Sequence, residues 1–104
     1  MATTHLSPEQ LKELEQNVQQ TLIKFPEEVV RIRYSFDQDW YGDPAINFRI
    51  LLSDRATRDD RFAQILRRVR DSLDEMELAK PEFHPFFYFR SQSEEDRLKD
   101  PEWE

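Results

Sequence analysis

The stretch that decides the fold is residues 29–52, VVRIRYSFDQDWYGDPAINFRILL. Apolar and polar residues alternate with a period of two on both sides of its centre, a pattern typical of half-buried β-strands. The centre, Asp39–Pro44, contains the only glycine in the 104-residue chain, and a glycine between two such runs indicates a tight turn. We therefore predict a β-hairpin. A turn centred on Gly42 makes the apolar faces of the two strands coincide. The resulting cross-strand pairs are Phe36–Phe48, Tyr34–Ile50 and Ile32–Leu52.

Amphipathic helices are predicted on both sides of the hairpin. Residues 7–10, SPEQ, are typical of a helix start in which the serine is the N-cap and the glutamine completes a capping box. Apolar residues at spacings of three and four then continue to Phe25. A second helix is predicted from about Arg58 to Glu77, with Thr57 as its N-cap. The aromatic run Phe86–Arg90 predicts a third strand.

The order α-β-β-α-β predicts an α+β fold, a two-layer sandwich. Both helices cover one apolar face of a three-stranded, mainly antiparallel sheet. The third strand returns parallel to strand 46–52 by a right-handed crossover. It can lie beside either hairpin strand, and we favour strand 30–36, which gives the order 2-1-3. We assign residues 1–90 to a single domain and residues 91–104 to an acidic C-terminal tail.

The composition limits the classes of protein to consider. The chain is long enough to bury one core, and it has no cysteine for disulfides or thiolate metal sites. It contains no long apolar run and no basic start followed by an apolar segment, so we predict a cytoplasmic protein without membrane association. The net charge of −7 disfavours broad attraction to phosphate backbones and favours a basic partner.

One face of the predicted sheet points away from the helices, and it carries arginines and an aromatic residue. Arginine forms forked hydrogen bonds with acidic groups and tyrosine offers a stacking plane, so this face is a candidate contact surface. At the turn, Trp40 and Tyr41 are candidate interface anchors. Alternatively, the arginines pair with nearby acids or with the acidic tail, and the turn aromatics fold back over a core edge, which we favour for Trp40. The candidate partner-binding residues are Arg31, Arg33, Trp40, Tyr41, Arg49, Tyr88 and Arg90.

The acids of the turn, Asp37, Asp39 and Asp43, do not predict a metal site. In a calcium loop that starts at the first of these, a phenylalanine occupies the place of the bidentate glutamate, so we interpret the three as solvated turn formers. The two histidines, His5 and His84, are too far apart in sequence to predict a metal site. No nucleophile motif and no phosphate-binding loop occurs in the sequence. We therefore predict no catalytic, metal-binding or cofactor-binding residues and no enzyme activity.

The hairpin sequence also supports a comparison. Residues 39–45, DWYGDPA, continuing into residues 48–54, FRILLSD, resemble a family of small uncharacterised prokaryotic proteins with a similar hairpin. The resemblance covers about residues 29–90, and it implies a cytoplasmic prokaryotic domain without assigning any site. The element order also resembles that of type II KH-like RNA-binding domains, whose Gly-x-x-Gly clamp this chain lacks.

These observations predict a non-enzymatic protein-interaction module without cofactors. It would serve as an accessory, antitoxin-like or immunity-like partner of a more basic protein. The alternative is nucleic-acid or nucleotide binding through the arginine-bearing sheet face. A homodimer formed through open sheet faces or edges is also left open.

Overall fold

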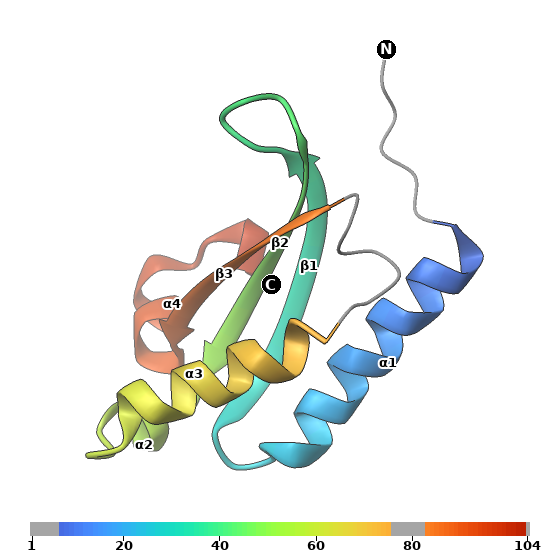
Figure 1. Ribbon diagram of the computed structural model, residues 1–104. Coiled ribbons are helices and arrows are strands. Elements are labelled where there is room, and N and C mark those ends of the chain that lie inside the picture. Colours follow the sequence, from blue (N-terminus) through green and yellow to red (C-terminus); the bar gives the residue numbers. More distant parts are fainter. Residues whose placement is uncertain (1–6, 76–82, 104) are drawn as a thin grey trace.

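The computed structural model of the chain describes residues 7–75 and 83–103, with the exception of the Glu102 side chain. It confirms the α+β class and the element order α-β-β-α-β, and it adds short helices at two places (Figure 1). The elements are α1 (Pro8–Lys24), β1 (Val29–Gln38), β2 (Pro44–Leu52), α2 (Asp54–Thr57), α3 (Phe62–Leu73), β3 (His84–Ser91), α4 (Gln92–Leu98) and the 3-10 helix η1 (Pro101–Trp103).

Helix α1 begins as the sequence predicts. The hydroxyl of Ser7 accepts a hydrogen bond from the Gln10 N–H at 3.1 Å, and the Gln10 side chain accepts one from the Ser7 N–H at 2.8 Å. This is the predicted capping box. The helix ends at Lys24, one residue before the predicted end, and Phe25 caps it by donating its N–H to the Thr21 carbonyl.

The predicted hairpin is confirmed, but its predicted register is wrong. Tyr34 lies opposite Phe48, and the other core pairs shift in the same way. The loop centres on Tyr41 because Asp39 closes it: the Asp39 carboxylate accepts hydrogen bonds from the N–H groups of Tyr41 and Asp43, each at 2.9 Å. Gly42 supplies the positive φ of 83° that the loop needs. The shift of two residues preserves which side chains face the core, since strand side chains alternate. The observed pairs are Ile32–Ile50, Tyr34–Phe48 and Phe36–Ile46.

The second predicted helix starts later than expected. Thr57 is not its N-cap but the last residue of α2, a short helix capped by Ser53, whose hydroxyl accepts from the Ala56 N–H at 3.1 Å. A turn follows in which Asp59 accepts a hydrogen bond from the Arg61 N–H, and α3 begins only after it. The segment therefore divides into two helices, of which the first has the side-chain cap, Ser53. α3 ends at Leu73, where Asp74 caps it by donating its N–H to the Arg70 carbonyl at 2.9 Å, so the helix ends before the predicted end at Glu77.

The predicted strand order 2-1-3 is wrong. β3 pairs with β2 in parallel, and the order is β1-β2-β3, so the sheet has one antiparallel and one parallel pair. The unit β2–α3–β3 is a crossover connection that returns the chain beside the strand it left. β2 is therefore the central strand. Leu51 lies on the face away from α1 and α3 and is nevertheless buried, because α4 packs against this end of β2.

The core lies between the sheet and the helices α1 and α3, which cover one face of it (Figure 1). At its centre Phe48 is fully buried, and its ring stacks on Phe87 with 5.3 Å between the centroids. The two helices are joined by a buried hydrogen bond of 2.6 Å between the hydroxyls of Thr21 and Ser72. The two-layer arrangement is therefore the predicted one.

Residues 91–103 are not the polar tail that the sequence suggested. Ser91 accepts a hydrogen bond from the Glu94 N–H at 3.2 Å and caps α4. Trp103 packs back on the sheet with only 7% of its surface exposed. The Arg90 guanidinium lies over its ring, 4.4 Å from the centroid. The C-terminal segment thus covers part of the sheet face opposite α1 and α3, which we call the open face.

Candidate functional site: an aromatic and acidic groove at the hairpin end

Pairing across the sheet arranges the open face in rows. Two of the rows carry the predicted contact residues, and two lie nearer the hairpin end. From the covered end to the hairpin end, the rows are Arg31–Leu51–Arg90, Arg33–Arg49–Tyr88, Ser35–Asn47–Phe86 and Asp37–Ala45–His84. The C-terminal segment covers the first row, so the contact surface consists of the other three.

The arginines of the covered row are engaged within the chain. Arg31 donates a hydrogen bond to the carbonyl of Trp103. Arg90 donates to the Glu95 carboxylate at 3.2 Å and lies 3.6 Å from that of Asp100. Both arginines therefore hold the C-terminal segment on the sheet. Of the two, Arg90 does so by pairing with acids of the C-terminal segment, as the alternative interpretation predicts.

The arginines of the next row lie nearer to solvent. Arg49 is half-buried and donates a hydrogen bond of 2.8 Å to the hydroxyl of Ser35, and Arg33 is exposed. Tyr88 lies in the same row, with 49% of its surface exposed. Of the predicted contact residues on the sheet, Arg33 and Tyr88 are the most accessible.

The turn aromatics project into solvent. Trp40 is 93% exposed and Tyr41 is 86% exposed, so the packing that we favoured for Trp40 is wrong. The Asp39 side chain closes this loop by accepting hydrogen bonds from the N–H groups of Tyr41 and Asp43. Two exposed aromatic rings therefore stand beside the open face.

A groove with a volume of about 450 Å³ lies between these rings and the sheet. We call it the hairpin-end groove. Its lining residues are Asp37, Gln38, Asp39, Trp40, Tyr41, Ala45, Asn47, Phe86 and Tyr88. Four aromatic residues and two acidic residues thus line one concave surface. Sequence reasoning included three of the aromatic residues but missed Phe86, because its place beside Asn47 depends on the strand order.

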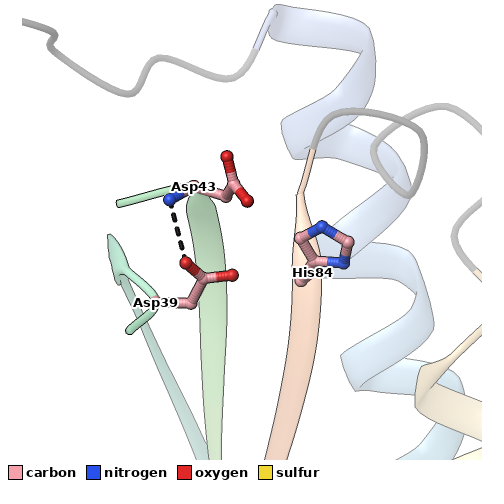
Figure 2. A group of neighbouring side chains, drawn as sticks. All are labelled: Asp39, Asp43 and His84. Carbon is pink, nitrogen blue, oxygen red and sulfur yellow. Dashed lines mark hydrogen bonds between the residues drawn. The ribbon is translucent and has the colours of Figure 1, made fainter. Parts of the chain in front are cut away.

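His84 lies beside two of the turn acids, which the sequence did not predict. Parallel pairing sets it opposite Ala45, directly below the hairpin loop. One ligand atom from each of Asp39, Asp43 and His84 lies within 4.8 Å of the others. Figure 2 shows the three side chains directed toward one another, with Asp39 also hydrogen-bonded to the Asp43 backbone. The sequence did not predict this group because His84 is distant in sequence from the turn and the third strand was predicted to lie beside strand 30–36.

A second concavity, of about 240 Å³, lies at the opposite end of the molecule. Acidic and basic side chains alternate around it, including Glu27, Arg55 and Asp59. Asp59 accepts hydrogen bonds from the backbone and side chain of Arg61, and these hold the pKa of its carboxyl below the usual value. Asp59 and Arg61 are therefore paired there, whereas the hairpin-end groove combines acidic residues with exposed aromatic residues.

Comparison with known proteins finds no family model and no curated protein that matches the chain. The resemblance of the hairpin to small prokaryotic proteins therefore stays a prediction. Within residues 7–75 and 83–103, none of the helices combines the length and the apolar character needed to cross a membrane.

Proposed function

We propose that this protein is an interaction module that binds a basic segment of a partner protein in the hairpin-end groove. The observation that carries the proposal is the combination of four aromatic side chains with two carboxylates in one groove. Each kind of group attracts a Lys or Arg side chain, and the groove presents both kinds together.

The aromatic rings favour a cationic side chain through their negative faces. A Lys or Arg over a Trp or Tyr ring gains about 0.5–1 kcal/mol at an exposed site and about 2 kcal/mol when water is excluded. Trp40 and Tyr41 form one side of the groove, and Tyr88 lies on the sheet. A cationic side chain inserted between them would contact aromatic surface on both sides.

The carboxylates supply the opposite charge. Asp37 and Asp39 line the groove, and Asp43 is in the same loop. The whole chain carries a net charge of −7, which raises the encounter rate with a basic partner. Charge complementarity therefore favours a basic segment over an acidic one.

The exposure of the aromatics supports a contact role. Trp and Tyr are enriched among the residues that dominate binding energy at protein interfaces. Nearly complete exposure means that Trp40 contributes little to the core of this chain. A role in partner contact accounts for a tryptophan at this position.

The alternative function, nucleic-acid binding through the arginine face, has less support. Arg31 and Arg90 hold the C-terminal segment, which lies over their row of the face. Three acids lie near the groove, where they repel phosphate. Binding of single-stranded RNA is therefore an outcome that would count against the proposal.

The proposal is tested by fluorescence anisotropy with a labelled peptide rich in Arg and Lys, using chelator-treated protein. We expect Trp40→Ala and Tyr88→Ala each to weaken binding by roughly tenfold or more, as for the loss of an interface anchor. Ile23→Ala is the matched control, since Ile23 is 75% exposed on α1, far from the groove.

Charge is tested by a second pair of variants. Asp37→Asn removes a carboxylate of the groove, and Asp60→Asn removes an exposed carboxylate outside it. We expect the first to weaken peptide binding more than the second. Equal effects of the two, or unchanged binding in Trp40→Ala, would show that the peptide is held only by net charge and would contradict the proposed site.

A further inference from the structure

We propose that Asp39, Asp43 and His84 form a binding site for a divalent transition-metal ion of the zinc class. The inference goes beyond the proposed function, because it concerns a different ligand at the edge of the hairpin-end groove. It rests on the arrangement of three metal-ligating side chains from two separate segments, the hairpin loop and the first residue of β3.

The three ligand atoms are close enough to share one ion. They lie within 4.8 Å of one another. Ligand atoms bound to one ion at about 2.1 Å lie roughly 3.0–3.4 Å apart, so closure needs shifts of about 1 Å. Asp43 and His84 are exposed, so their side chains can adjust by rotation alone.

The Asp39 carboxylate is already oriented. One of its oxygens accepts hydrogen bonds from the N–H groups of Tyr41 and Asp43. Figure 2 shows its other oxygen directed toward the side on which His84 lies. A backbone hydrogen bond of 2.8 Å from the Asp39 N–H to the Asp43 carbonyl also joins these two residues and holds them at a fixed separation along the loop. The loop thus presents both carboxylates from one rigid turn.

The kind of ligand atom selects the class of ion. One imidazole with two carboxylates suits Zn²⁺, Mn²⁺, Ni²⁺ or Co²⁺, since imidazole nitrogen favours transition metals. Mg²⁺ and Ca²⁺ prefer sets of oxygen ligands and gain less from the histidine. Two carboxylates also balance the charge of a divalent ion, and three protein ligands leave a coordination position for water.

An ion at this site would join the hairpin loop to the start of β3. These segments belong to neighbouring strands, and no hydrogen bond between Asp39 or Asp43 and His84 is found in the described part of the chain. An ion that binds only to the folded chain would raise the melting temperature, and the rise would grow with the logarithm of the ion concentration.

The experiment is isothermal titration calorimetry of the full, chelator-treated chain with ZnCl₂, with MgCl₂ as the comparison ion. We expect one zinc ion to bind per chain, and to bind more tightly than magnesium. His84→Ala and Asp43→Asn should each weaken zinc binding by roughly tenfold or more, because each removes one of three ligands. Asp60→Asn is the control, an exposed acid that lies outside both the group and the hairpin-end groove.

Two further measurements identify the site independently of affinity. Zinc should shift the imidazole NMR signals of His84, and the same shift should occur in a His5→Ala variant. Zinc should also raise the melting temperature of wild type but not of His84→Ala. Undiminished zinc binding by His84→Ala, or equal binding of magnesium and zinc, would overturn the proposal. Peptide binding is measured with chelator-treated protein, so a result that contradicts the metal site leaves the proposed function standing. A result that contradicts peptide binding likewise leaves the metal site standing.

Discussion

The substitution Trp103→Ala tests the packing of the C-terminal segment against the open face. Trp103 is 7% exposed, its ring lies under the Arg90 guanidinium, and its carbonyl accepts a hydrogen bond from Arg31. Truncation of a buried aromatic residue to alanine costs about 3–5 kcal/mol in protein cores. The variant retains the backbone carbonyl, so the loss is confined to ring burial and the contact with Arg90. We therefore expect the free energy of unfolding to fall by about 3 kcal/mol.

Urea denaturation followed by far-UV circular dichroism measures this change. A loss of that size in a domain of about 100 residues lowers the melting temperature by roughly 10 °C or more. Trp40→Ala is the matched control, since its side chain is 93% exposed, and its effect should stay within about 0.5 kcal/mol. A loss below about 1 kcal/mol in Trp103→Ala would refute the claim that this segment is part of the domain.

Three further outcomes follow from contacts elsewhere in the chain. Thr21→Val removes the buried hydrogen bond to Ser72 and should lower the free energy of unfolding by about 1–3 kcal/mol. Adding Ser72→Ala to this variant should recover part of the loss, which a double-mutant cycle in urea would measure. Gly42→Ala should lower the free energy of unfolding by about 1–3 kcal/mol, measured by thermal unfolding. The reason is backbone strain alone, because φ is 83° and an added Cβ meets nothing within 4 Å. An unchanged melting temperature would contradict this geometry. Hydrogen bonds from the hydroxyl and the N–H of Ser93 hold the pKa of Asp54 in the folded chain below its usual value. These bonds therefore contribute to stability at a pH above the pKa of Asp54 in the unfolded chain. The contribution is lost as the pH falls through the lower pKa of the folded chain. The Ser93 amide NMR signal should therefore shift with acidification below about pH 4 in wild type and not in Asp54→Asn.

The sequence predicts the elements of this fold better than their positions in space. Alternation in residues 29–52 is a local property, and it correctly predicts the hairpin and, from Ile32 on, the side chains that face the core. At the start of β1 a register shift buries Val29 and exposes Val30, which the alternation placed on the core face. The register depends on the length of the loop, which the Asp39 side chain sets through hydrogen bonds that the alternation does not encode. The strand order depends on how α3 returns the chain. Leu51 is an apolar residue among the polar residues of the open face, and this is the sequence pattern expected of a strand that is covered on both faces.

The candidate site could be predicted only in part. Trp40 and Tyr41 were selected as candidate contacts because both are large aromatic residues at a turn, and the structure shows that both are exposed. Phe86 and His84 were missed, because their neighbours are known only once β3 is placed beside β2. The C-terminal helix had a signal of its own, a serine at position 91 followed three residues later by Glu94, which is the pattern of a helix N-cap.

The most direct test of the proposed function is an NMR titration of the isotope-labelled, chelator-treated protein with the Arg- and Lys-rich peptide. We predict that the largest shifts fall on the indole N–H of Trp40 and on Tyr41, Phe86 and Tyr88, while α1 signals stay in place. Shifts spread evenly over the acidic surface would contradict the account. So would an unchanged Trp40 signal together with shifts of Arg33 and Arg49 on addition of single-stranded RNA.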